Sequence, residues 1–242
     1  MSHGFPEIVF ANDDLVAVNK PSGWLSIPDR HDHELISVKT WLEAKGDKVF
    51  IIHRIDKDTS GLIVFAKNAE AHKYYNTLFQ NRNLEKTYYG LTSGTFNHEQ
   101  GVCDQPIEEH PVVAGKMRVG RKGKSALTHY CVEEQFKGYS LMRFVIETGR
   151  THQIRVHMQN IGHPLACDPL YGSGDFIKLS SFKKKFNLSK KDEEERPLLA
   201  RLALHAYSLS FVDRQGAEIK LTAPLSKDME ACLKQMRKWA KL

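Results

Sequence analysis

The stretch VFIIHRIDKDTSGLIVFA, residues 49–66, sets two apolar runs around a polar segment. The runs 49–52 and 62–66 are short, continuous and rich in β-branched or aromatic residues, which is typical of strands buried on both faces. Residues 53–61 between them are mostly charged or polar and end in a glycine. Functional residues concentrate in polar loops carried by rigid core strands. The stretch therefore predicts part of the core and a candidate site.

Asp56 is the residue of this loop that most needs an explanation. It lies next to Ile55 and close to two apolar strand ends, where a carboxylate requires a cationic partner or a shifted pKa. We interpret Asp58, Thr59 and Ser60 differently, as side chains that hydrogen-bond the backbone of the turn. Asp56 is thus the candidate for chemistry, and its neighbours are candidates for support.

A second polar cluster, RTHQIRVHM, occupies residues 150–158. Ile154, Met158 and Ile161 follow helical spacing, which predicts a short helix packed by one stripe. A guanidinium from its polar side could keep the Asp56 carboxylate ionised and oriented. From the residues alone, the two clusters allow a glycosidase, an RNA-modifying enzyme or a structural ion pair.

Metal binding by the second cluster is not favoured. His152 and His157 are five residues apart, so they do not share one helical face, and no carboxylate follows at the spacing of a zinc protease. The alternative to a functional role for this cluster is an ordinary surface helix with ion pairs.

The remaining apolar segments are mostly short and strand-like. Further strands are predicted at 7–12, 15–20, 87–91, 126–132, 141–146, 204–211 and 218–221, and helices at 37–44, 68–79 and 226–239. Strands outnumber helices without βαβ alternation, so the predicted fold is α+β, with a mixed, largely antiparallel central sheet, flanking helices and a catalytic cleft. No glycine-rich phosphate loop follows a strand, which argues against a nucleotide cofactor.

Composition indicates a cytoplasmic protein. No apolar run approaches the ~20 residues of a membrane-spanning helix, and four scattered cysteines do not form a disulfide framework. We expect one catalytic domain over residues 1–242, with a surface insertion at 173–197 that carries lysines 183–185, 190 and 191. No linker divides the chain, and a monomer is expected.

The charge balance suggests a polyanionic partner without deciding it. Thirty-five Lys and Arg against 29 Asp and Glu give a net charge of +6. The segment KMRVGRKGK, residues 116–124, holds Arg118, Arg121 and Lys122 with no acid. It is either a solvated hairpin loop or a pliable arm that contacts phosphates.

Five motifs in order resemble the pseudouridine synthases of the RluA and RsuA type, in particular compact RluA members without an S4 RNA-binding domain. The motifs are NKPSG at 19–23, HRIDKDTSG at 53–61, KTY at 86–88, GRTHQIRVH at 149–157 and GHPLACDPLYG at 162–172. Two positions depart from the family pattern. Ile55 replaces a leucine, and Cys167 replaces a glycine.

The resemblance implies a role for each matching residue. Asp56 corresponds to the catalytic aspartate, Arg155 to the arginine that pairs with it, and Tyr88 to the aromatic residue that packs against the target base. Arg54 corresponds to the residue that fills the space of the flipped nucleotide. Lys20 and the 116–124 segment, with Arg118, Arg121 and Lys122, are expected as exposed cations that contact the RNA backbone.

The implied activity is isomerisation of uridine to pseudouridine in a stem-loop of ribosomal or transfer RNA, with no cofactor or metal. Asp56 could attack ribose C1′ or remove the C2′ proton, and the sequence does not choose. The alternatives are a non-catalytic RNA-binding or RNA-folding protein on the same scaffold, and a hydrolase that acts on a glycosidic bond.

Overall fold

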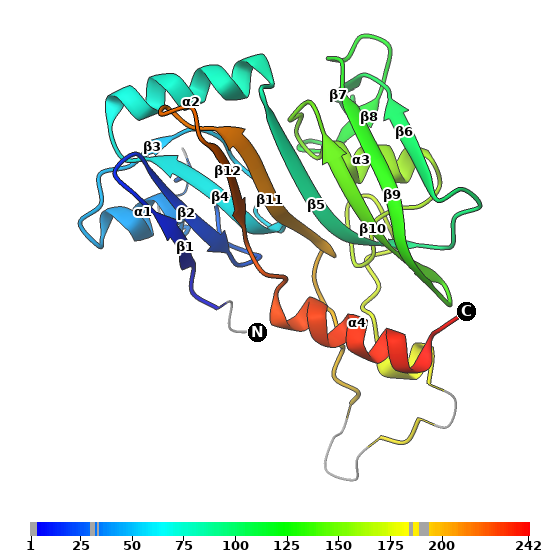
Figure 1. Ribbon diagram of the computed structural model, residues 1–242. Helices are drawn as coiled ribbons and strands as arrows, with labels where there is room; N and C mark the ends of the chain where they lie inside the picture. The colour runs from blue at the N-terminus through cyan, green and yellow to red at the C-terminus, as the bar shows by residue number, and fades with distance from the viewer. Residues whose placement is uncertain (1–3, 30–31, 33, 184–185, 189–193) are drawn as a thin grey trace. The chain divides into compact units, whose positions relative to one another are not determined.

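The structure, a computed structural model, describes residues 4–29, 32, 34–183, 186–188 and 194–242 (Figure 1). The chain divides into two compact units. The first comprises Met1–Tyr88, Val145–Glu147 and His205–Pro224, and the second comprises Tyr89–Phe144, Thr148–Leu204 and Leu225–Leu242. The single catalytic domain expected from the sequence stays a prediction.

The fold is α+β, with a mixed, mostly antiparallel sheet, as predicted. The elements of the first unit are β1 (Glu7–Ala11), β2 (Leu15–Lys20), α1 (Val38–Glu43), β3 (Phe50–Ile51), β4 (Ser60–Ala66), α2 (Ala69–Asn81), the start of β5 (Leu84–Ser93), β11 (Leu204–Val212) and β12 (Glu218–Thr222). Strand β4 pairs antiparallel with β2 and parallel with β11, and β1 and β12 extend the order on either side (Figure 1).

Strand β4 is buried along all seven residues because helices cover both of its faces. Leu62 and Val64 belong to the cluster that contains Tyr75 of α2. Ile63 and Phe65 belong to the cluster that contains Leu42 of α1. Alternate residues of a strand point to opposite faces, so the continuous apolar run of the sequence supplies two cores.

The junction of β4 with β11 requires a glycine. Gly61 has φ 108°, and a Cβ atom there would lie 2.1 Å from the Ala206 carbonyl oxygen. Beside it, the buried Ser60 hydroxyl and His205 Nδ1 are 2.9 Å apart. These contacts fix the start of β4, which is where the polar loop 53–59 ends.

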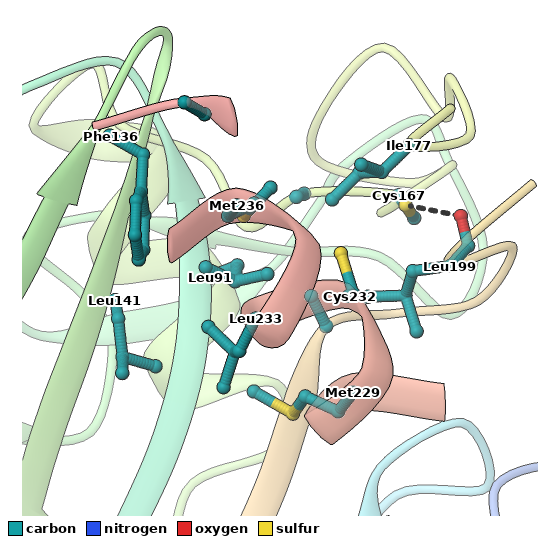
Figure 2. Packing of buried hydrophobic residues seen from close by; sticks show 13 residues of the cluster. Leu91, Phe136, Leu141, Cys167, Ile177, Leu199, Met229, Cys232, Leu233 and Met236 are labelled. Atoms are coloured by element: carbon teal, nitrogen blue, oxygen red, sulfur yellow. Dashed lines mark hydrogen bonds between the residues drawn. The ribbon is translucent and has the colours of Figure 1, made fainter. Parts of the chain in front are cut away.

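The second unit contains the rest of β5, β6 (Gln100–Asp104), β7 (Ile107–Glu109), β8 (Met117–Val119), β9 (Leu127–Phe136), β10 (Tyr139–Ile146) except its last two residues, α3 (Gln153–Asn160), the 3-10 turn Leu179–Ser181, the first residue of β11 and α4 (Lys227–Trp239). Met229, Leu233 and Met236 of α4 pack in one core cluster with Leu91 and Leu141 (Figure 2). The C-terminal helix predicted from its apolar spacing therefore closes this core. Among the described residues, no helix is long and apolar enough to cross a membrane.

The segment 173–197 is not confined to the surface. Ile177 is fully buried in the core of the second unit, and its backbone pairs with Leu199 (N to O, 2.9 Å). Lys183 Nζ lies 5.1 Å from the centroid of the Trp239 ring. The other lysines expected here, 184, 185, 190 and 191, lie outside the described residues.

Candidate active site

Lys20 is buried and supports the loop that carries Asp56. Its side chain has no exposed surface, and Nζ donates to the carbonyl oxygens of Trp24 (2.8 Å), Lys57 (2.9 Å) and Pro21 (3.2 Å). Lys20 is therefore not the exposed RNA contact expected from the sequence. Backbone carbonyls, which carry partial negative charge, replace the water that a buried ammonium loses.

The segment after Lys20 adds further hydrogen bonds to the same loop. Ser26 Oγ donates to the Ile55 carbonyl oxygen (2.7 Å) and accepts from the Ile55 N–H (3.1 Å). Gly23 N donates to the Lys57 carbonyl oxygen, and Ser22 Oγ donates to that of Asp58. The backbone is thus held immediately before and after Asp56.

Tyr88 belongs to the first unit, as Asp56 does, and the charge of Asp56 acts on it. Burial, and then the negative charge of Asp56, raise the pKa of the Tyr88 phenol. The hydroxyl therefore stays protonated across the neutral range, and what the residue offers a ligand is a ring with a neutral polar end. Asp56 is partly buried, whereas Arg54 of the same loop is exposed.

His53, at the start of the loop, is a neutral hydrogen-bond acceptor. Nε2 accepts from the Val64 N–H (3.1 Å), and the ring stacks on Phe79 with centroids 4.7 Å apart. Burial, and then the charge of Lys86, lower the pKa of His53 to about 3. The ring thus joins the loop to β4 and α2 without carrying charge at neutral pH.

His53 is expected to make folding depend on pH. The pKa of about 3 lies below the ordinary 6.5, so below pH 6.5 the unfolded chain binds a proton that the folded chain does not. This contribution to stability is complete above pH 6.5 and is lost as the pH falls, by up to about 1.4 kcal/mol per pH unit. Between pH 7 and pH 5 we expect the wild type to lose about 2 kcal/mol more than His53→Gln.

Urea unfolding at the two pH values measures this difference. His98→Gln, at an exposed histidine, is the matched control and should lose as much stability as the wild type. Equal losses in the wild type and in His53→Gln would contradict a neutral, half-buried ring.

Arg155 lies on α3 in the second unit and is paired there with Asp168. Nε donates to Asp168 Oδ2 (2.8 Å) and Nη2 donates to Oδ1 (2.9 Å), and both side chains are at most 4% exposed. The helix is more buried than the single stripe predicted, since all of Gln153–Met158 is buried. Pairing of Arg155 with Asp56, which belongs to the first unit, stays a prediction.

Asp168 was missed as a site residue, although it lies within the motif GHPLACDPLYG. The preceding residue, Cys167, has φ 57°, in the left-handed region that favours glycine. This conformation explains why a glycine is usual at that position, and Cys167 adopts it while donating its thiol to the Leu199 carbonyl oxygen (3.4 Å). Burial raises the pKa of the Cys167 thiol to about 11.

His157 of α3 and His152, the N-cap of that helix, make separate contacts within the second unit. His157 is fully buried, with Nδ1 2.9 Å from Thr128 Oγ1 and Nε2 3.0 Å from the Gln105 carbonyl oxygen. His152 Nδ1 lies 2.8 Å from the Tyr171 hydroxyl oxygen. Within the part of the chain that the structure describes, no three His, Cys, Asp or Glu side chains form a group that could hold a metal ion.

The basic segment 116–124 forms part of a β-hairpin. Arg118, on β8, is exposed and pairs with Glu108 of β7 (Nη2 to Oε1, 2.7 Å). Arg121 and Lys122 are exposed in the turn that follows. A Cβ atom on Gly123 would lie 2.4 Å from the backbone of Ile107, so this glycine permits close packing rather than a pliable arm.

Comparison with known proteins identifies the family. Residues 14–160 match the RNA pseudouridylate synthase family. The chain is 37% identical over 237 residues to ribosomal large subunit pseudouridine synthase D of Nitrosomonas europaea, covering 96% of this chain and 65% of that protein. It is 34% identical to an uncharacterized RNA pseudouridine synthase, YlyB, of Bacillus subtilis, covering 96% and 73%.

A solved structure shares the fold. Human RNA pseudouridylate synthase domain containing 1 superposes with a TM-score of 0.74 at 24% identity, over 99% of this chain and 91% of that one. The extent of the family match and the identity to relatives establish membership. The chain belongs to the RNA pseudouridylate synthase family.

Proposed function

We propose that this protein isomerises uridine to pseudouridine in RNA, with Asp56 as the catalytic residue. The observation that carries the proposal is the way in which the backbone of the loop 53–59 is held around Asp56. Hydrogen bonds from Lys20, Ser22 and Ser26 hold its backbone on both sides of Asp56, and Tyr88 lies close enough for the Asp56 charge to raise its pKa. A carboxylate carried by a backbone held in this way suits chemistry that depends on exact placement.

The reaction breaks the bond between ribose C1′ and uracil N1, turns the base and joins C1′ to C5. The C5 proton leaves and N1 gains one, so atoms and electrons balance without an external reagent. Asp56 acts at the sugar, either by attack on C1′ or by removal of the C2′ proton. The Tyr88 ring packs against the uracil, a contact worth ~1–3 kcal/mol for a stacked base.

Arg155 and Arg54 have supporting roles in the proposal. In the proposal, the Arg155 guanidinium orients the Asp56 carboxylate through charge-assisted hydrogen bonds. The exposed side chain of Arg54 fills the space left when the target nucleotide leaves its helix, which offsets part of the few kcal/mol that flipping costs.

The RNA is proposed to be ribosomal, because the relative in Nitrosomonas europaea is named as an enzyme of the ribosomal large subunit. Transfer RNA is the second substrate class. We propose that the protein acts as a monomer in the cytoplasm. Mapping pseudouridines across ribosomal and transfer RNA in a deletion strain tests the substrate. One missing position that returns with the wild-type gene supports the proposal, and an unchanged map contradicts it.

The hairpin β7–β8 is proposed to contact the RNA backbone through Arg121 and Lys122. Each cation that neutralises a phosphate adds about 0.7–0.9 to the slope of log Kd against log salt. The double variant Arg121→Gln/Lys122→Gln should therefore lower this slope by about 1.5, as measured by fluorescence anisotropy over a salt series. Arg118→Gln should change the slope less, because Glu108 already pairs with that guanidinium.

An unchanged slope in the double variant would remove the turn from the interface. A larger effect of Arg118→Gln than of the double variant would instead show that Arg118 leaves Glu108 for a phosphate when RNA binds.

A further inference from the structure

The segment 168–171 holds the Arg155 guanidinium on one edge and one face. Asp168 takes the edge formed by Nε and Nη2 in a two-hydrogen-bond fork of 2.8 and 2.9 Å. The Tyr171 ring takes the face, with its centroid 4.9 Å from Arg155 Cζ. An arginine side chain has several rotatable bonds, so contacts on two sides define where the rest of the guanidinium points.

Asp168 is also held in place by contacts other than those with Arg155. Its Oδ1 also accepts hydrogen bonds from the backbone N–H groups of Leu170 (3.0 Å) and Tyr171 (3.1 Å), and its side chain is fully buried. The backbone on its N-terminal side is anchored as well, since Ala166 N donates to the Leu91 carbonyl oxygen at 2.8 Å. The position of the Asp168 carboxylate in the second unit is therefore fixed independently of Arg155.

Tyr171 is held from its other end. The Met117 N–H donates to its hydroxyl oxygen at 2.8 Å, and His152 Nδ1 lies 2.8 Å from the same atom. Met117 belongs to β8 and His152 is the N-cap of α3. The ring that covers Arg155 is therefore tied both to the helix of Arg155 and to the hairpin.

We propose that Asp168 is a positioning residue for the isomerisation, which acts through Arg155. The fork uses two of the five N–H groups of the guanidinium and so orients the other three toward further acceptors. The inference rests on the proposed function, in which one such acceptor is the Asp56 carboxylate. Asp168 also supplies the counter-charge that a buried arginine requires.

Steady-state kinetics on a folded RNA transcript tests the inference. Asp168→Asn keeps the acceptor for Leu170 and Tyr171 but accepts only one hydrogen bond from Arg155, and Asp168→Glu keeps the charge but displaces the guanidinium. Both should lower kcat by about 10²-fold with KM within about threefold, because a shift near 1 Å in a positioned group costs that much. Asp175→Asn, at an exposed aspartate of the neighbouring segment, should match the wild type.

A double-variant comparison separates positioning from mere structural support. If Asp168 acts through the fork, Asp168→Asn should lower kcat no further in a protein that already carries Arg155→Lys. If Asp168→Asn does not fold, Asp168→Glu, which retains the ion pair, decides the matter. Wild-type kcat in either folded Asp168 variant, or additive losses, overturns the inference alone. Absence of pseudouridine with the wild type and Asp175→Asn overturns the proposed function and the inference with it.

Discussion

Replacement of Asp56 by asparagine is expected to lower kcat for pseudouridine formation by at least about 10⁴-fold, with the Kd for RNA within about threefold. Asparagine has nearly the same shape, so the loop held by Ser26 and Gly23 should keep its backbone. An amide is neither a nucleophile toward C1′ nor a base toward the C2′ proton, and loss of such a group removes most of the catalysis.

Single-turnover assays with enzyme in excess measure this effect without interference from product release. Asp58→Asn is the matched control, because Asp58 is exposed in the same loop and is expected to support the turn only. It should keep at least about half of the wild-type rate. Activity in Asp56→Asn close to that of Asp58→Asn would remove Asp56 from the chemistry.

Lys20→Met is expected to lower both stability and turnover. Methionine has a similar length but no donors, so the Trp24 and Pro21 carbonyls lose their hydrogen bonds from Nζ and the Lys57 carbonyl keeps only that from Gly23. Unsatisfied buried acceptors cost ~1–3 kcal/mol each, and loss of the buried ammonium returns part of that. We expect the free energy of unfolding to fall by about 3 kcal/mol. We also expect kcat to fall about 10²-fold, because the loop that carries Asp56 shifts.

Urea unfolding and kcat, measured where the variant is folded, test the two parts separately. Lys57→Met is the control, because that lysine is exposed in the loop and contributes only its backbone to the network. Unchanged stability of Lys20→Met combined with a smaller salt dependence of RNA binding would contradict the buried role and return Lys20 to the RNA interface.

The sequence predicted the elements whose apolar pattern is strong. The run LIVFA lies in β4, as predicted, and Met229, Leu233 and Met236 lie on α4, the helix that their spacing predicted. The short strands β6, β7 and β8 were not predicted, because three to five residues with few apolar positions carry too little periodicity. Local patterns therefore identified the core but not these short strands, although a hairpin loop at 116–124 was one of the two interpretations of the basic segment.

The site was predicted in its residues more than in its contacts. The sequence singled out Asp56, and the structure adds that the KPSG turn holds its loop. The sequence wrongly predicted an exposed Lys20. Its side chain donates to the backbone carbonyl of Lys57, 37 positions further along the chain, and no pattern of side chains reveals such a contact. Asp168 was missed for a related reason. Only the fold brings it to Arg155, and the sequence already offered Asp56 as an acid for that arginine.

Assay of the purified wild-type protein on ribosomal RNA labelled with tritium at uracil C5 tests the central claim most directly. The account predicts release of one tritium for each pseudouridine formed, with no free uracil in solution, because the uracil detached from C1′ at N1 is rejoined to C1′ at C5 before it can leave the enzyme. Free uracil among the products, or RNA that binds without any release of tritium, would contradict it.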